Sequence, residues 1–324
     1  MIIITGGAGF IGSAMVWKLN QLGYQDIMIV DRLGTSKKWL NLRSLKWREY
    51  RHKTEFLQLI KEDKVKGNIE AVIHLGACSA TTELDMDFLV ENNLNYSKSL
   101  LSWAREKCAR FIYASSAATY GDGSNSFDDQ KSIDKLEPIN RYGYSKHLFD
   151  VWVKEQKLSD SVVGLKFFNV YGPNEVHKGS MQSVVSKAVK EIKETGQVKL
   201  FKSYHPDYQD GCQRRDFIYV KDCISVMNWF LENPKSNGLF NLGTGQAKTW
   251  RELTGAVFKA MNIEENIEYI EMPAELKSHY QYFTQASMSK LRNAGYKEKF
   301  ESLEDGVKDY VQNFLVEEKY LSSI

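Results

Sequence analysis

The sequence predicts an α/β protein: a doubly wound parallel sheet with a smaller, interleaved α/β domain towards the C-terminus. Three observations support this fold class. Short β-branched runs alternate with helical patterns through the first half, and a glycine-rich turn follows the first run. After Asn169 the pattern changes to helices with scattered short strands and a polar loop. A chain of 324 residues is also too long for one small domain.

The main sheet is expected to begin with a strand at Ile2–Thr5, followed by a helix at Ile11–Leu22. Later apolar runs are each followed by small or polar residues and then by a helical pattern. They predict buried strands at Ile27–Val30, Ala71–Leu75, Phe111–Ser115 and Val162–Phe168. Because repeated strand–helix units form parallel sheets, we expect ligands at the carboxyl ends of these strands.

The second half is predicted to rejoin the sheet in part. A helix at Met181–Thr195 and a polar stretch from Lys202 to Arg214 belong to the smaller domain. Strands at Phe217–Val220 and Leu239–Leu242 are apolar enough to return to the main sheet. The predicted division is therefore a Rossmann-type domain of residues 1–168 with 216–243 and a second domain of 169–215 with 244–324, part of 286–300 returning to the first.

The sequence predicts the first residues of two helices in the second domain. Thr249 precedes Glu252 by three residues, which is the spacing of a capping box, and this helix should run to about Met261. Ser302 and Asp305 have the same spacing near the end of the chain. In such a box each side chain pairs with a backbone N–H of the other residue, so the helix begins between them.

Composition excludes several classes of partner. The net charge of +2 and the lack of a long basic run argue against a nucleic-acid partner. No stretch reaches the roughly 20 apolar residues that cross a bilayer, so no membrane partner is expected. Four separated cysteines without a C-x-x-C pair indicate neither zinc nor disulfides and fit a cytoplasmic protein. The six histidines form no metal-ligand pair, so no metal is expected.

The segment TGGAGFIG follows the first strand and places Gly6, Gly9 and Gly12 at the start of a helix. Without side chains the backbone can approach a pyrophosphate closely, and the helix N-terminus supplies N–H groups and a positive dipole end. A flexible turn is the alternative interpretation. The preceding strand, the following helix and the acid at the end of the second strand favour a dinucleotide site.

Residues after the second strand bear on the choice of dinucleotide. Asp31 ends that strand, where an acid commonly bonds the adenosine ribose hydroxyls, and alone it would indicate NAD. Arg32 follows at once, with Lys38 and Lys53 beyond, and these cations can neutralise a phosphate on the ribose. A solvated basic face is the alternative for the lysines. The cluster favours NADP and leaves NAD open.

A catalytic group is predicted on one helix face. Tyr142 and Lys146 are four residues apart, so both face the same side, and a buried ammonium would lower the pKa of the phenol. Ser116 comes just after a strand, where its hydroxyl can bond the reacting oxygen. Tyr144 lies two residues before Lys146 and points elsewhere. We therefore assign the base role to Tyr142 and expect Ser116 and Lys146 beside it.

The motifs TGGAGFIG, YASSAATYG, YGYSK and FFNVYGP, in this order, resemble the extended short-chain dehydrogenase/reductases over nearly the whole chain. That superfamily includes sugar epimerases, dehydratases and reductases. Dehydratases typically carry Asp-Glu after the catalytic hydroxyl, but Ala117 and Ala118 stand there in this sequence. Dehydration is therefore disfavoured.

The segments NVYGPNEVHKGSM, LGACSATTE and YQYFTQASM are similar to the ADP-heptose epimerase family in particular. That resemblance implies that Lys178 is a second acid/base opposite Tyr142, because inversion exposes both faces of one carbon. A phosphate-binding or solvated lysine is the alternative for Lys178. The implied reaction converts the D-glycero to the L-glycero epimer of ADP-glycero-manno-heptose at carbon six with bound NADP, for lipopolysaccharide inner-core synthesis, in a homo-oligomer.

The same resemblance implies the binding residues. The cofactor set is Gly6, Gly9, Phe10, Ile11, Gly12, Asp31, Arg32, Lys38, Lys53, Leu75, Gly76, Ala77, Cys78, Ser79, Asn92, Lys146, Val170 and Lys178. The substrate set is Asn169, Ser180, Lys187, Phe201, Lys202, Ser203, Arg215 and Tyr280. Two departures make the substrate set less secure: Lys187 stands where the family has histidine, and the loop Tyr204–Gln213 is long.

Two other functions remain open at this stage. The chain could be a different nucleotide-sugar epimerase or a net reductase, which would consume NADPH during turnover. It could also be a non-catalytic regulator that senses NADP through the same surface. The presence of Ser116, Tyr142 and Lys146 together argues against the regulator.

Overall fold

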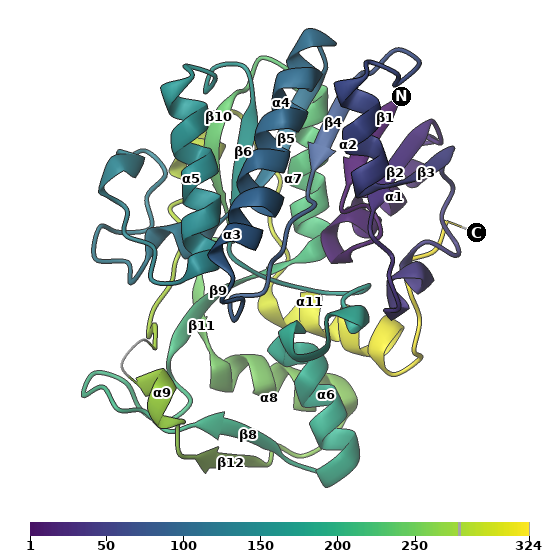
Figure 1. The fold of residues 1–324 in the computed structure, drawn as a ribbon. Coiled ribbons are helices and arrows are strands. Elements are labelled where there is room, and N and C mark those ends of the chain that lie inside the picture. The colour runs from purple at the N-terminus through teal and green to yellow at the C-terminus, as the bar shows by residue number, and fades with distance from the viewer. Residues whose placement is uncertain (278–279, 324) are drawn as a thin grey trace.

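The fold is described from a computed structural model, in which residues 1–277 and 280–323 are described. A large part built on one sheet lies above a smaller part in Figure 1. The large sheet has seven parallel strands in the order β10-β6-β5-β4-β1-β2-β3. Their bounds are β1 Ile2–Thr5, β2 Ile27–Asp31, β3 Glu49–His52, β4 Ala71–His74, β5 Arg110–Ser116, β6 Val163–Phe167 and β10 Gly238–Leu242. The doubly wound parallel sheet is therefore confirmed.

Helices cover both faces of this sheet, as the two halves of its core show. Ile4 on β1 points to the face where α1 (Phe10–Gln21) packs against α7 (Val220–Glu232). Ile3 points to the other face. That face is covered by α2 Lys53–Lys61, α4 Tyr96–Glu106 and α5 Arg141–Glu155, with α3 Met86–Leu89 and a π-helical turn, η2 Val90–Asn95, leading into α4. Alternate strand residues thus fill two separate cores, which is why the strands read as continuous apolar runs.

The smaller part holds α6 Val184–Thr195, α8 Trp250–Met261, α9 Ala274–Lys277 and a parallel pair of strands, β8 Val198–Phe201 and β12 Ile267–Ile270 (Figure 1). The side chain of Thr249 accepts from the N–H of Glu252, and the Glu252 carboxylate accepts from the Thr249 N–H. This capping box is confirmed, and so is the end of the helix at Met261. Helix α6 begins three residues later than predicted, because Ser183 caps it and a short 3-10 turn, η5 Val176–Met181, precedes it.

One predicted strand does not join the main sheet. The strand predicted at Phe217–Val220 is β9 (Arg214–Tyr219), which pairs with β7 (Asn169–Tyr171) and β11 (Ala247–Thr249) in a separate three-stranded sheet. The prediction that it returns to the main sheet is wrong, because β10 occupies the place beside β6. The other returning strand, predicted at Leu239–Leu242, does join the main sheet as β10.

The last elements contact both parts, first β10 of the main sheet and then α8 of the smaller part. They are α10 Ser289–Asn293, α11 Leu303–Tyr310 and the π-helical turn η6 Val311–Leu315, and Ser302 caps α11 at the Asp305 N–H as predicted. The Lys290 ammonium donates to the carbonyl of Leu239 on β10, at 2.7 Å. The Ser323 N–H donates to the carbonyl of Ser44. The C-terminal tail therefore lies against the N-terminal half, whereas the domain boundaries stay a prediction.

Three more 3-10 turns complete the described elements: η1 Lys37–Asn41, η3 Ala117–Tyr120 and η4 Ile133–Lys135. Strand β3 was not predicted, because its residues Glu49–His52 are polar and half-buried at the sheet edge. Among residues 1–277 and 280–323, no helix has the length and apolar character needed to cross a membrane.

Candidate active site

The glycine turn lies between β1 and α1. Gly6 has a φ of 67°, and its N–H donates to the carbonyl of Val30 at 2.7 Å. A Cβ added at Gly12 would lie 2.1 Å from the Gly6 carbonyl oxygen, so no side chain fits there. No side chain caps the start of α1 in the structure as described. The first N–H groups of this helix are therefore available to an anion, as a dinucleotide pyrophosphate requires.

Asp31 connects this turn to the loop after β2. One carboxylate oxygen accepts from the Ala8 N–H at 2.9 Å. The other accepts from the Arg32 N–H at 2.6 Å and from the Lys38 ammonium at 2.9 Å. Asp31 is 7% exposed and stays within reach of a ligand, because it lines the cavity beside it. The carboxylate thus fixes both the turn and the first cation of the neighbouring cluster.

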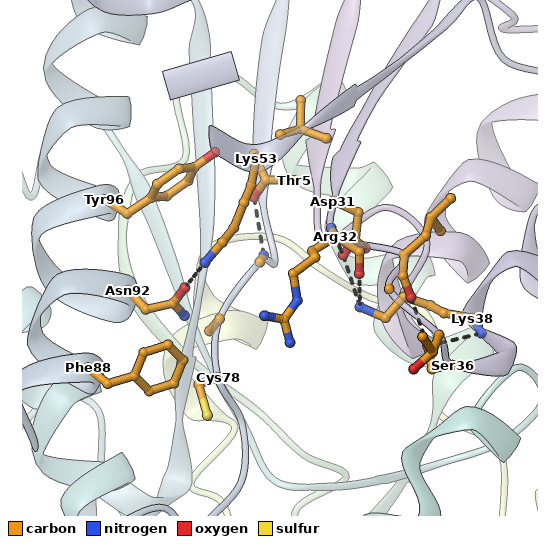
Figure 2. A pocket seen from close by; sticks show the side chains of 17 residues that line it. Thr5, Asp31, Arg32, Ser36, Lys38, Lys53, Cys78, Phe88, Asn92 and Tyr96 are labelled. Carbon is orange, nitrogen blue, oxygen red and sulfur yellow. Dashed lines mark hydrogen bonds and ion pairs between the residues drawn. The ribbon is translucent and has the colours of Figure 1, made fainter. Parts of the chain in front are cut away.

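A cavity of about 330 Å³ opens beyond Asp31, and Figure 2 shows the cations around it. Arg32, Lys38 and Lys53 all line it, and the Lys53 ammonium donates to the Asn92 side chain from the π-helical turn η2. Burial lowers the pKa of Lys53, and the nearby Arg32 guanidinium lowers it further. Two mutually repelling cations held in one cavity form a site whose repulsion an anion would relieve.

A second cavity of about 320 Å³ adjoins the first and shares Gly6, Asp31, Lys38, Gly76 and Ala77 with it. Ser116, Tyr142, Lys146 and Lys178 all line this second cavity. Every residue of the predicted cofactor set lines one cavity or the other. The structure therefore gathers residues from the whole N-terminal half, and from the segment around Lys178, into one continuous hollow.

The tyrosine and lysine of the YGYSK motif lie on α5. The Asn140 side chain caps α5 by accepting from the Gly143 N–H at 2.8 Å, which starts the helix one residue before Tyr142. Burial raises the pKa of Tyr142, and a hydrogen bond from Ser116 partly opposes that rise. Burial lowers the pKa of Lys146 to about 8. The prediction that Lys146 lowers the pKa of the Tyr142 phenol is wrong for this geometry, because the effect of burial is larger. Tyr144, the competing tyrosine, is 46% exposed and does not line the cavity.

A buried ion pair that was not predicted lies behind these groups. Lys166 on β6 and Asp150 on α5 are both fully buried, with 2.7 Å between ammonium and carboxylate. The same carboxylate accepts from the hydroxyls of Ser115 at 2.6 Å and Tyr113 at 3.1 Å, both on β5. The pair therefore joins β6 to α5, which carries Tyr142, and to β5, which ends at Ser116. The available signal was the position of Asp150, four residues after Lys146 on the same helix face.

Lys178 reaches the cavity from the 3-10 turn η5. Its ammonium lies 5.5 Å from the ring centroid of Phe10 at the start of α1. Burial lowers the pKa of Lys178, the Glu175 carboxylate raises it, and Lys187 lowers it. Burial, Lys38 and Lys178 lower the pKa of the neighbouring His177 to about 4. Lys178 therefore lies in a basic environment in which one carboxylate, that of Glu175, opposes the effect of burial and of Lys187 on its pKa.

The predicted substrate residues are less well gathered. Arg215 is buried between Trp250 and Tyr280, 5.7 and 5.4 Å from their ring centroids, and Phe201 packs edge-on to Tyr280. Lys202 pairs with Glu271, and the Ser203 hydroxyl donates to the His205 carbonyl. Asn169, Ser180 and Lys187 are exposed. None of these predicted substrate residues lines either of the two cavities.

The long loop 204–213 contributes aromatic residues that were not predicted. His205 and Tyr208 pack against Tyr282, with ring centroids 5.1 and 5.4 Å away. Together with Tyr280 they line a separate cavity of about 620 Å³. No group of histidine, cysteine, aspartate and glutamate side chains in residues 1–277 and 280–323 has the arrangement of a metal site.

Comparisons with known proteins show the family of this chain. Residues 2–243 match the model of the NAD dependent epimerase/dehydratase family. The chain is 56% identical over 316 residues to the ADP-L-glycero-D-manno-heptose-6-epimerase of Nitratidesulfovibrio vulgaris, covering 97% of this chain and 98% of the relative. It is 49% identical to the enzyme of that name from Fusobacterium nucleatum, covering 98% and 99%.

Solved structures give the same result for the fold. The Helicobacter pylori ADP-L-glycero-D-manno-heptose-6-epimerase superposes with a TM-score of 0.80 at 29% identity, covering 96% of this chain and 95% of that one. UDP-glucose 4-epimerase from Thermotoga maritima has a TM-score of 0.81 at 24% identity, covering 98% and 99%, and shows the shared fold alone. The chain therefore belongs to the NAD dependent epimerase/dehydratase family and, within it, to the ADP-L-glycero-D-manno-heptose-6-epimerases.

Proposed function

We propose that the protein interconverts ADP-D-glycero-D-manno-heptose and its L-glycero epimer at carbon six of the heptose. The product would be a precursor for synthesis of the lipopolysaccharide inner core. The observation that carries this proposal is the second cavity. It holds Ser116, Tyr142 and Lys146 from one set of elements and Lys178 from another. An inversion needs proton donors and acceptors that reach the oxygen on one carbon from two directions, and the origin of these side chains in two separate segments supports the proposal.

In the proposed mechanism the residues that line the two cavities would hold a nicotinamide dinucleotide, which would supply the transfer of hydride from carbon six and back to it. Tyr142 takes the hydroxyl proton of one epimer while Ser116 hydrogen-bonds the same oxygen. Lys146 keeps positive charge beside the phenol. The ketone then turns over in the cavity, and Lys178 returns a proton to the oxygen when hydride is added to the opposite face. One proton and one hydride leave and one of each return, so the reaction is redox-neutral.

The first experiment gives the purified protein ADP-D-glycero-D-manno-heptose and follows the sugar by NMR. We expect the L-glycero epimer to appear without net change in NADPH absorbance. Tyr142→Phe and Lys178→Met should each slow epimerisation by about 10²- to 10⁴-fold. In single turnovers they should affect opposite epimers, because each residue serves one face. No product from the wild-type protein would refute the proposal, and stoichiometric loss of NADPH would indicate a reductase instead.

We also propose NADP as the cofactor. Arg32, Lys38 and Lys53 around the first cavity support this choice, because together they carry more positive charge than the single Asp31 carboxylate neutralises. Arg32→Gln should weaken NADP binding by about 10- to 100-fold, the range for a hydrogen bond to a charged group. Binding of NAD should change by less than about threefold, since NAD has no 2′-phosphate. Titration of protein fluorescence with both dinucleotides measures the difference, and an equal loss for NAD would refute the assignment.

The substrate contacts are proposals of the same kind. Arg215, already held between two aromatic rings, would clamp the diphosphate bidentately, and Tyr280 would hold its far end. Phe201, Lys202 and Ser203 would line the nucleotide pocket, while Asn169, Ser180 and Lys187 would contact the heptose side. We further propose a cytoplasmic homo-oligomer with the domain division predicted from the sequence. Native mass spectrometry would measure subunit number and retained cofactor together.

A further inference from the structure

The turn that carries Lys178 is closed by one carboxylate. Glu175 precedes the turn, and one of its oxygens accepts from the Ser183 N–H while the other accepts from the Ser183 hydroxyl, both at 2.6 Å. The Gly172 N–H also points at this carboxylate, at 3.4 Å. Glu175 and Ser183 therefore bracket residues 176–182, with Lys178 inside the bracket. The Lys178 N–H donates to the Glu175 carbonyl at 2.9 Å, which fixes the backbone as well.

The carboxylate is unusual for its burial. Glu175 is 1% exposed and has no cation within ion-pair distance among the described residues. Burial raises its pKa, whereas the two hydrogen bonds from Ser183 lower it. A buried glutamate that served packing alone would be replaced at low cost by a neutral residue of the same shape. A charge at this position can have a second function besides its hydrogen bonds, which is to act on a cation beyond ion-pair distance.

The surroundings of Lys178 identify that function. The groups that influence the pKa of Lys178 are Glu175, which raises it, and Lys187 on α6, which lowers it. His177 lies next to it and is held neutral by burial and by its cationic neighbours, and Phe10 offers only its ring. Glu175 is the one anion that acts on this ammonium among the interactions described. Its effect on the pKa of Lys178 opposes the effects of burial and of Lys187.

We propose that Glu175 is the positioning residue for Lys178: its carboxylate holds the turn closed on Ser183 and supplies a negative charge that acts on the ammonium from beyond ion-pair distance. The kinetic part of this inference rests on the proposed function, because in that function Lys178 acts as an acid/base. Its structural part, the influence of Glu175 on the ammonium, can be measured without any turnover. A role confined to folding would affect both faces of the reaction equally, whereas positioning of Lys178 affects one.

The kinetic test uses Glu175→Gln in the NADP-bound enzyme, with single-turnover formation of NADPH followed from each epimer in separate experiments. The epimer whose oxidation is slowed by Lys178→Met should be slowed by about 10- to 100-fold in Glu175→Gln, the range for losing a charged hydrogen bond. The other epimer should change by less than about threefold. Equal slowing of both epimers, or of neither, would overturn the proposal.

The second readout needs no cofactor. The rate at which a small amine-acylating reagent labels Lys178, followed by peptide mass spectrometry across pH, reports the midpoint for loss of its proton. In Glu175→Gln this midpoint should fall by about 1 pH unit, because the opposing negative charge is gone. An unchanged midpoint would overturn the proposal even if the rate fell. If wild-type protein shows no epimerisation, the proposed function fails, while this measurement still decides the relation between the two residues.

The matched control is Glu252→Gln. Glu252 also accepts from the N–H and hydroxyl of one helix-capping residue, Thr249, at 2.7 and 2.9 Å, but it lines neither cavity. This variant should leave both single-turnover rates and the labelling midpoint of Lys178 unchanged. Should Glu175→Gln not fold, Ser183→Ala carries the same test by removing one hydrogen bond from the carboxylate. We then expect slowing of the Lys178-dependent epimer alone, and equal slowing of both would overturn the proposal.

Discussion

The second cavity is bounded by two walls that are built in different ways. The tyrosine wall consists of β5, β6 and α5, which carry Ser116, Tyr142 and Lys146, and the fully buried pair of Lys166 and Asp150 joins all three elements. The lysine wall is the 3-10 turn η5, closed by the bracket between Glu175 and Ser183. The first wall belongs to the main sheet and its covering helix, and the second is a short loop at the start of the smaller part.

The difference indicates how the two proposed acid/base groups, Tyr142 and Lys178, can differ in mobility. A sheet-borne group held by a buried ion pair moves only with its whole layer. A group on a short turn depends on a few local hydrogen bonds, so it can adjust when substrate enters. Since one heptose carbon must be approached from two directions, a rigid wall opposite an adjustable one suits the proposed inversion. The comparison predicts that damage to the tyrosine wall reduces stability, whereas damage to the lysine wall reduces activity.

The largest expected effect on stability comes from breaking the buried pair. Lys166→Met leaves the Asp150 carboxylate buried without its cation, which should lower the free energy of unfolding by about 3–5 kcal/mol. Lys178→Met removes the contact with the Phe10 ring, about 0.5–1 kcal/mol, and breaks no ion pair within 4 Å among the described residues. Urea unfolding of both variants, with CD as the probe, measures the two values.

The difference in stability loss between Lys166→Met and Lys178→Met tests the distinction between the two walls. Both substitutions exchange a lysine for methionine, so side-chain length and the loss of one charge are matched. A comparable loss of stability in both variants would contradict the distinction. So would a Lys166→Met protein as stable as the wild type, because the buried pair would then not hold the tyrosine wall together.

The next effect concerns pH and belongs to β4, the strand that pairs with β5 of the tyrosine wall. His74 on β4 is fully buried between Thr5 and Ser97, and burial, with Lys146 nearby, lowers its pKa from 6.5 to about 3. The unfolded chain therefore takes up this proton below pH 6.5 while the folded chain does not. Stability from this residue is fully present above pH 6.5 and is lost as pH falls towards 3, by about 2 kcal/mol between pH 6.5 and 5.

Urea unfolding at several pH values between 5 and 7 checks this slope. In His74→Gln the side chain no longer titrates, so the slope should become shallower even though the variant is less stable at pH 7. A variant with the wild-type slope would show that other groups cause the pH dependence. His177 in the lysine wall, with a folded-state pKa lowered from 6.5 to about 4, should add a slope of similar size over this range, so His74→Gln should remove only part of the pH dependence.

The cofactor side of the site was predictable from the sequence because its signals are local. A glycine turn, an acid at the end of a strand and a tyrosine four residues before a lysine each act within one strand–helix unit. The parallel sheet then brings the ends of those units to one edge. For that reason Gly6, Asp31 and Tyr142, which are far apart in the sequence, line two adjoining cavities as expected.

The parts that were missed depend on contacts between distant segments or on polar residues without a pattern. The pairing of Asp150 with Lys166 needs the register of a helix on a strand, and the bracket of Glu175 needs the fold of a turn. Strand β9 appeared apolar enough for the main sheet, yet β10 had already filled the available edge. The aromatic loop 204–213 was long enough to notice, but nothing local indicated which rings would meet.

The smallest expected effect provides the reference for both walls. Ser302 caps α11 by accepting from the Asp305 N–H at 3.0 Å, and its hydroxyl donates to the Asp305 carboxylate at 2.6 Å. Ser302→Ala should lower the free energy of unfolding by about 1 kcal/mol, because one helix N–H loses its acceptor. Neither residue lines the two cavities, so single-turnover rates of both epimers should stay at wild-type values. If this variant slowed the oxidation of one epimer selectively, a loss of stability alone would be enough to change the rate at one wall. The selective slowing expected for Glu175→Gln would then not demonstrate positioning of Lys178.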